Sequence, residues 1–194
     1  MESKPKILAF AGSTRQDSFN KKLVAIAAEG ARNAGAEVTV IDLRDFPMPL
    51  YDADFEKEHG MPENAKKLMD LMIEHHGFLI ASPEYNSSVS GVLKNTIDWV
   101  SRPVKGMTPL KAFEEKVACL MSASDGALGG LRGLSALRWI LGNIKIIVLP
   151  KQIAVPHAKE AFDENGRLKD EKLHASIEHL GKSLTDIIRK LKSE

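Results

Sequence analysis

The segment from Gly12 to Asn20 carries the side chains best suited to hold an anion. It contains hydroxyl, amide and guanidinium groups, on Ser13, Thr14, Arg15, Ser18 and Asn20. It follows the apolar run Lys6 to Ala11 and leads into a stretch of helical period, so backbone N–H groups at a helix start can join these donors. The pattern predicts a phosphate-binding loop. The alternative is a capping loop in which Ser18 merely caps the helix.

The known nucleotide-binding fingerprints do not fit this segment. The chain has no G-x-x-x-x-G-K-[ST], which disfavours a nucleoside triphosphatase of the P-loop type, and no G-x-G-x-x-G of the dinucleotide-binding type. A loop rich in hydroxyls but lacking the P-loop lysine suits a monophosphate better than a triphosphate. FMN is a common cofactor that ends in a single phosphate.

A second polar segment, Ser82 to Ser88, follows the apolar run that begins at Gly77. Pro83 stiffens it, Tyr85 offers a flat face to an aromatic ring, and Asn86 can satisfy ring carbonyls and nitrogens. In a doubly wound sheet, ligands bind at the carboxyl ends of strands that flank the topological switch point, here the first and third. We therefore expect this segment to meet the phosphate loop. The alternative is a proline-turned helix entry with Tyr85 half buried.

A third segment, Ser122 to Gly130, is made of small residues and glycines that would let backbone approach the edge of a ring. Such turns also occur wherever chains cross, so this signal alone favours neither a ligand nor a plain turn. Taken together with the first two segments, it supports a ligand site more strongly than it does alone.

The elements that position these segments alternate between strand and helix. Five apolar runs predict strands, at Lys6 to Ala11, Glu37 to Leu43, Gly77 to Ser82, Lys116 to Ser122 and Lys145 to Val155. Helical stretches lie between and after them, at Asn20 to Asn33, Pro62 to His75, Val89 to Val100, about Gly130 to Leu141, and Leu173 to Leu191. Continuous apolarity in the first, third and fourth runs indicates strands covered on both faces. The pattern predicts an α/β fold of three layers. The segment from Phe46 to Pro62 reads as a long loop.

Composition excludes several classes of protein. The 194 residues include 27 Lys plus Arg against 26 Asp plus Glu, a balance that disfavours binding to nucleic acid or to a charged membrane surface. The length favours a single domain over residues 1–194. No signal segment or membrane span is expected, so we expect a cytoplasmic location. Cys119, the one cysteine, lies in an apolar run and is expected to be buried and inert.

Three motifs together resemble the NADPH-dependent FMN reductase family. They are Gly12-Ser13-x-Arg15-x-x-Ser18-x-Asn20-x-x-Leu23, Pro83-Glu84-Tyr85-Asn86 and Gly91-Val92-Leu93-Lys94-Asn95-x-Ile97-Asp98-Trp99. The resemblance spans nearly the whole chain and implies a flavodoxin-like sheet of five parallel strands in the order 2-1-3-4-5. The chain departs from the family pattern at Ser87, where glycine is common, and at Ser90, where proline is frequent.

The resemblance also implies a role for individual residues. Residues of the first segment would hold the FMN phosphate, namely Ser13, Arg15, Ser18, Phe19 and Asn20. Residues of the second would line the isoalloxazine ring, namely Pro83, Glu84, Tyr85 and Asn86. Ser122, Ser124 and Gly126 would approach its far side or the ribityl chain.

The expected activity is hydride transfer from NADPH or NADH to FMN, followed by delivery of two electrons to a small acceptor. The resemblance implies that quinones, azo compounds, chromate or ferric complexes are the acceptors. No catalytic side chain is obligatory, because the cofactor carries the redox chemistry. Family members are commonly dimers or tetramers, and the stretches Leu128 to Leu141 and Phe46 to Pro62 are the expected interfaces.

Other classes of protein are less well supported. A flavodoxin-type electron carrier would share the cofactor, but carriers of that type are strongly acidic and use another phosphate loop. A cofactor-free scaffold is disfavoured because it would not explain why three polar loops are expected to converge. A metal enzyme is disfavoured because the six histidines show no i, i+4 pair. A cysteine phosphatase is disfavoured because Asp125 stands where its arginine would follow Cys119.

Overall fold

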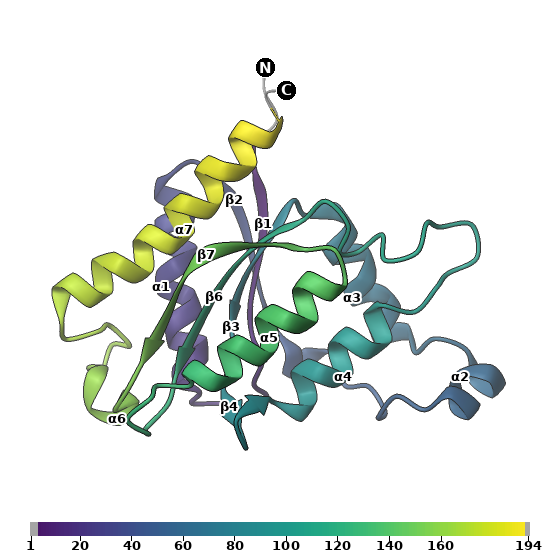
Figure 1. Ribbon diagram of the computed structural model, residues 1–194, viewed down its shortest axis with the longest axis horizontal. Helices are drawn as coiled ribbons and strands as arrows, with labels where there is room; N and C mark the ends of the chain where they lie inside the picture. The colour runs from purple at the N-terminus through teal and green to yellow at the C-terminus, as the bar shows by residue number, and fades with distance from the viewer. Residues whose placement is uncertain (1–3, 193–194) are drawn as a thin grey trace.

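A sheet of five parallel strands in the order β2-β1-β3-β6-β7 forms the centre of the computed structural model (Figure 1). The structure describes residues 4–192. The strands are β1 (Lys6–Ala11), β2 (Glu37–Asp42), β3 (Gly77–Ala81), β6 (Val117–Ala123) and β7 (Ile147–Val155). The predicted flavodoxin-like order is therefore confirmed, with β6 and β7 as the fourth and fifth parallel strands. Each predicted run matches its strand to within two residues at either end.

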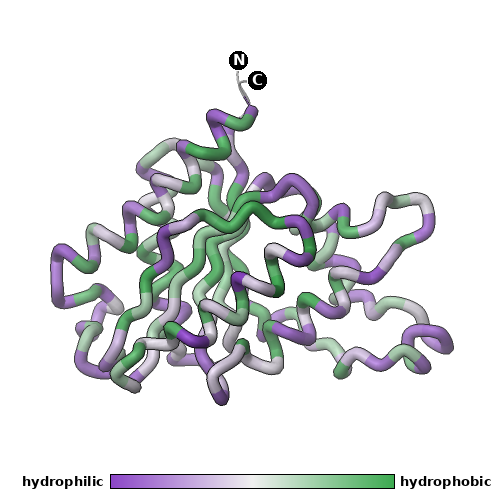
Figure 2. Tube along the Cα trace, viewed as in Figure 1, coloured by the Kyte–Doolittle hydropathy of each residue, from purple (hydrophilic) through white to green (hydrophobic). Residues whose placement is uncertain are grey.

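The three inner strands are buried on both faces, as their continuous apolarity predicts. In β1, Ile7 and Ala9 pack into one apolar cluster and Leu8 and Phe10 into another, because successive side chains point to opposite faces. The edge strands β2 and β7 are only partly covered. Figure 2 shows the apolar strands as a band through the middle of the molecule, with polar residues on the outer helix faces and loops.

Helices cover both faces of the sheet and complete the three predicted layers (Figure 1). The helices α1 (Phe19–Asn33) and α7 (Glu171–Lys192) supply the cluster on one face. On the other face lie α3 (Glu63–Glu74), α4 (Gly91–Val100) and α5 (Leu131–Asn143). These are the five helices expected from sequence, again with ends within two residues. A short helix, α6 (Ala158–Ala161), connects β7 to α7.

Helices α1 and α7 pack backbone against backbone. A Cβ added at Gly30 would overlap the backbone carbonyl of Glu178, and one added at Gly181 would overlap that of Ala27. Each glycine therefore lets one helix backbone rest directly on the other. This contact fixes α1, and with it the loop that precedes α1, against the C-terminal part of the chain.

The segment from Phe46 to Pro62 differs from the prediction of a long loop, because it contains the helix α2 (Ala53–His59). A short 3-10 turn, η1 (Leu43–Asp45), precedes the segment. Helix α2 starts where the Asp52 carboxylate accepts bonds from the N–H groups of Asp54 and Phe55. It buries none of its residues, so it has no apolar stripe from which it could be predicted. Figure 1 shows α2 beside α4, away from the sheet.

None of the helices described between residues 4 and 192 combines the length and apolar composition needed to cross a bilayer.

Candidate functional site

The loops that follow β1, β3 and β6 meet at the carboxyl edge of the sheet around a cleft of about 220 Å³. The residues that line it are Ser13, Arg15, Ser18, Phe19, Asn20, Pro83, Glu84, Tyr85, Ala123, Ser124 and Asp125. All but three of the residues predicted for a cofactor site are therefore brought together. Asn86, Ser122 and Gly126 lie outside this lining, whereas Ala123 and Asp125 belong to it without having been predicted.

The first loop presents hydrogen-bond donors to the cleft. Its start is fixed by the bond from Gly12 N–H to the carbonyl of Ala81 at the end of β3 (2.8 Å). Ser18 occupies the N-cap position of α1, but its hydroxyl makes no capping bond. The simple capping role is therefore not what the structure shows. The N–H groups of Phe19 and Asn20 lie in the first turn, where a helix offers them no internal partner.

The Asn20 side chain joins the first loop to the third. Its Nδ2 donates to the carbonyl of Ala123 (2.9 Å), and its Oδ1 accepts from the N–H of Ala123 (3.0 Å). Asn20 is buried, so both bonds are shielded from water. The amide that was predicted to hold a phosphate thus pairs with the last residue of β6 and fixes the spacing of two walls of the cleft.

Arg15 and Phe19 form the outer part of the same wall. The guanidinium carbon of Arg15 lies 5.3 Å from the centroid of the Phe19 ring, within range of a cation–π contact. The Phe19 ring also stacks on Phe162, with centroids 5.7 Å apart and an interplanar angle of 11°. Arg15 therefore has a defined place at the rim while its side chain stays exposed.

The second loop is a β-hairpin rather than an irregular segment. Strands β4 (Glu84–Tyr85) and β5 (Ser88–Val89) pair in antiparallel fashion, joined by Asn86 and Ser87 at positive φ angles of 51° and 64°. Two positive φ values in a two-residue hairpin turn are typical of a type I′ turn. Tyr85 is 56% exposed, so its ring is accessible to a ligand.

Two side chains anchor this hairpin to helix N-termini. The Glu84 carboxylate accepts a bond from the N–H of Gly133 in the first turn of α5 (3.0 Å). The Ser90 hydroxyl accepts from the N–H of Leu93 as the N-cap of α4, and it donates to the carbonyl of Gly12 (2.6 Å). Ser90, one of the two departures from the family pattern, therefore connects the second loop to the first.

The third loop holds its predicted residues at different depths. Ser122 is fully buried, and within residues 4–192 its hydroxyl has no hydrogen-bond partner. It faces Gly130, where an added Cβ would overlap the hydroxyl. Ser124 lines the cleft, and the Asp125 carboxylate accepts a bond from the N–H of Lys159 in α6 (2.8 Å). The third loop therefore lines the cleft with Ala123, Ser124 and Asp125 and is tied to α6.

These features fit the cofactor expected from sequence. The hydroxyls, free N–H groups and guanidinium of the first loop suit a phosphate. The exposed aromatic ring of Tyr85 on the hairpin suits a flat heterocycle. Between residues 4 and 192, no three His, Cys, Asp or Glu side chains gather closely enough to hold a metal ion.

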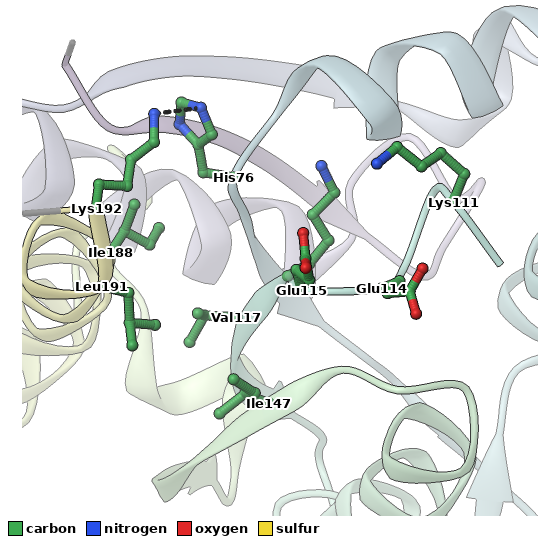
Figure 3. Close-up of a pocket in the computed structure, with 10 residues that line it drawn as sticks. His76, Lys111, Glu114, Glu115, Val117, Ile147, Ile188, Leu191 and Lys192 are labelled. Atoms are coloured by element: carbon green, nitrogen blue, oxygen red, sulfur yellow. Dashed lines mark hydrogen bonds between the residues drawn. The ribbon is translucent and has the colours of Figure 1, made fainter. Parts of the chain in front are cut away.

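The molecule has a larger cavity, of about 460 Å³, at the opposite edge of the sheet (Figure 3). It opens at the first residues of β6 and β7, where Val117, Ile147 and Leu191 form an apolar side. Lys192 Nζ lies 2.7 Å from His76 Nε2 at the rim. The cavity offers neither hydroxyls nor a glycine-rich loop, and two carboxylates, Glu114 and Glu115, line it, so its lining differs from that of the cleft.

Charge and burial at this second cavity have a structural explanation. Lys116 Nζ donates to the carbonyls of Ile73 and His75 at the end of α3 (2.8 and 2.6 Å), as expected of a cation at a helix C-terminus. Burial, with Lys192, Lys116 and Lys6 nearby, lowers the pKa of His76 to about 4. Lys116 therefore satisfies carbonyls at the end of α3, and burial together with the nearby lysines favours the neutral form of His76.

Cys119 lies in the interior of β6, away from the cleft. It is 1% exposed, and burial raises the pKa of its thiol to about 12. The expected burial is confirmed, and a thiol with so high a pKa carries almost no reactive thiolate.

The sheet order and the polar loops at its carboxyl edge define a flavodoxin-like protein. The family model for NADPH-dependent FMN reductase matches residues 5–160. The chain is 33% identical to an NAD(P)H-dependent FMN reductase of Pseudomonas aeruginosa over 188 residues, covering 96% of this chain and 97% of that protein. It is 36% identical to a quinone reductase of Escherichia coli over 152 residues, covering 78% of this chain and 77% of the relative.

A solved structure shows the same architecture. It is that of FerB, a flavoenzyme NAD(P)H:(acceptor) oxidoreductase from Paracoccus denitrificans, with a TM-score of 0.79 and 26% identity. The alignment covers 96% of this chain and 98% of that one. The chain belongs to the NADPH-dependent FMN reductase family. The predicted family, enzyme class and cofactor are thereby confirmed: an oxidoreductase with FMN as cofactor and NADPH or NADH as co-substrate.

Proposed function

We propose that this protein reduces quinones with electrons from NADPH or NADH, through FMN held in the cleft at the carboxyl edge of the sheet. One observation carries the proposal. Three loops separated in the chain converge on one cleft, where hydroxyl, N–H and guanidinium donors of the first loop meet an exposed tyrosine of the second.

The first loop would hold the phosphate. The hydroxyls of Ser13 and Ser18, the guanidinium of Arg15, and the N–H groups of Phe19 and Asn20 are the donors for it. Because the Asn20 amide pairs with Ala123, its part in phosphate binding falls to its backbone N–H. These donors act best on an anion because they surround the positive end of the α1 dipole.

The hairpin would hold the ring. Pro83 and Tyr85 supply apolar surface, and Asn86 supplies hydrogen bonds from the turn. Glu84 would act through its backbone, because its carboxylate is engaged with Gly133 in α5.

The third loop would close the far side of the ring. Ser124, which lines the cleft, would approach the ring directly, whereas Gly126 and the buried hydroxyl of Ser122 lie outside the lining and would act through the shape of the loop.

When bound, FMN supplies the redox chemistry, taking a hydride from the nicotinamide and delivering two electrons to the acceptor. The chain then needs to bind and orient both substrates on the exposed ring face. The names of the relatives support a quinone as acceptor. Azo compounds, chromate and ferric complexes are further acceptors that the same open ring face would admit.

We also propose that the protein works in the cytoplasm as a homodimer or homotetramer, without a nucleic-acid or membrane partner. The predicted interfaces carry exposed apolar side chains that support this. On α5, Leu131 is 46% and Trp139 is 82% exposed, and on the 46–62 segment Leu50 is 80% exposed. Light scattering at micromolar concentration tests the oligomeric state, and a monomeric mass would refute the proposed oligomer.

The test of the activity is the visible spectrum of the purified protein with added FMN. Anaerobic NADPH should bleach the flavin bands in one step, and a benzoquinone should restore them. Accumulation of a one-electron reduced species would favour the flavodoxin-type carrier. A colourless protein that ignores added FMN would refute the proposal and favour a cofactor-free scaffold.

A further inference from the structure

We propose that Arg132 and Ser87 together bind the 2′-phosphate of NADPH and give this enzyme a preference for NADPH over NADH. The inference rests on the proposed function, because it assumes that the nicotinamide meets the ring held beside the hairpin. The proposal gives Arg132 and Ser87 a role in nucleotide specificity that could not be predicted from their residue types or their spacing in the sequence.

The contact is defined by a hydrogen bond across two elements. Arg132 lies in the first turn of α5, exposed, and its Nη1 donates to the Ser87 hydroxyl on the hairpin turn (2.9 Å). Within residues 4–192 this is the one hydrogen bond of that guanidinium, which has five N–H donors. The remaining donors can face an anion, and because Ser87 Oγ is an acceptor in this bond, its proton is available for a second donation.

The backbone at Ser87 supports a role for its side chain. Its φ of 64° lies in the left-handed region, where a residue with a Cβ is destabilised relative to glycine. Residues kept in such conformations are often part of a binding site. The hydroxyl–guanidinium bond gives a reason for serine at a turn position that glycine would occupy without strain.

Other cations near the carboxyl edge have partners or unfavourable neighbours. Arg15 lies over Phe19 within the phosphate loop. Arg138 donates to the carbonyls of Val148 and Leu149 in β7. Lys159 follows the loop that carries the Asp125 carboxylate, which would repel a phosphate.

Position also favours Arg132. Ser87 follows Tyr85 by two residues on the same hairpin, and α5 is joined to that hairpin by Glu84. A dinucleotide whose nicotinamide lies against the ring beside Tyr85 can therefore extend along this hairpin toward Arg132. Arginine suits the contact because its planar guanidinium can bind a phosphate with two parallel bonds.

The test compares both nucleotides on the FMN-loaded protein. In Arg132→Ala, kcat/KM for NADPH should fall about 10- to 100-fold, the range expected for lost charged hydrogen bonds, while that for NADH changes less than about twofold. Ser87→Gly should lose part of the preference while raising the melting temperature, a combination that a purely structural role would not give. Lys159→Ala is the matched control and should keep the wild-type ratio.

A binding measurement separates this contact from turnover. By calorimetry, the wild type should bind 2′,5′-ADP more tightly than 5′-AMP, and Arg132→Ala should bind the two alike. Equal losses with NADPH and NADH, or a wild type without preference in both assays, would overturn the inference and leave the reductase standing. If the wild type oxidised neither NADPH nor NADH, the proposed function would fail. The comparison of 2′,5′-ADP with 5′-AMP would still decide whether Arg132 binds a 2′-phosphate.

Discussion

Replacing Asn20 by alanine tests whether the cleft is built by the tie between its first and third loops. The Asn20 amide makes two bonds to one residue, Ala123, that lies 103 positions along the chain. Both partners are buried, and the backbone N–H and carbonyl of Ala123 would lose their partners together. No other side chain within residues 4–192 bonds to that N–H or carbonyl.

The cost follows from the two groups left without a partner. A buried hydrogen bond contributes about 0.5–1.5 kcal/mol, and an unsatisfied buried group costs about 1–3 kcal/mol. Allowing for water that enters beside the cleft, we expect Asn20→Ala to lower the free energy of unfolding by about 2–4 kcal/mol. For a chain of this size, that corresponds to a drop of about 5–12 °C in melting temperature. FMN binding should weaken as well, because the two walls lose their fixed spacing.

Urea unfolding of the FMN-free protein, followed by circular dichroism, measures this loss without a contribution from the cofactor. Asn20→Asp adds a check on the same two bonds. A protonated Asp side chain can donate to the carbonyl of Ala123 and accept from its N–H, whereas an ionised one would place a carboxylate oxygen against that carbonyl oxygen and repel it. The folded-state pKa of that acid is expected above its ordinary value, so its stability should be greatest at low pH and decline as pH rises through that pKa. Asn143→Ala, at an exposed helix end, is the control. A loss below about 1 kcal/mol for Asn20→Ala would refute the reasoning.

Three further changes have defined outcomes. Ser90→Ala removes the cap of α4 and the bond to Gly12, so urea unfolding should show a loss of about 1–2 kcal/mol; an unchanged midpoint would contradict it. The lowered pKa of His76 means that the folded state favours the neutral ring, so stability should be constant above about pH 6.5 and fall toward pH 4. His76→Gln should reduce that fall by about 1 kcal/mol once solvent screening is allowed for, whereas His59→Gln at an exposed site should not. Gly181→Ala forces α7 off α1 and should cost more than about 3 kcal/mol by thermal unfolding, while Gly142→Ala, with open space around it, should not destabilise.

The sheet was predictable because burial on both faces leaves a strong signal in the sequence. The runs at β1, β3 and β6 are continuously apolar, and the structure buries them completely apart from Lys6. The positions of the three loops followed from the same signal, because a parallel sheet places the carboxyl ends of all its strands at one edge.

Elements held by polar bonds were not predictable in this way. Helix α2 begins at the Asp52 cap and has no buried face, so its sequence lacks the periodic apolar residues that predict a helix. The hairpin of β4 and β5 has strands too short for alternation to be visible, although Asn86 at a positive φ is a common turn residue.

Side-chain direction was the other limit. The sequence placed Asn20 and Glu84 at the cleft, but it could not show that Ala123 and Gly133 would engage their polar groups. These partners lie far along the chain, and only the packing of α1 and α5 on the sheet brings them close. The same is true of Ser90, whose bond to Gly12 spans 78 positions and gives a physical role to a departure from the family pattern.

These bonds share one property that bears on function. Asn20 joins the first loop to the third, Ser90 joins the second to the first, and Glu84 joins the second to α5. Each wall of the cleft is therefore fixed by a side chain from a different segment before any ligand arrives. Preorganisation of this kind reduces the entropy that binding must overcome. It leaves the donors proposed for a phosphate and the exposed ring of Tyr85 in place, so Ser90, although it differs from the family pattern, adjusts the frame of the site rather than its chemistry.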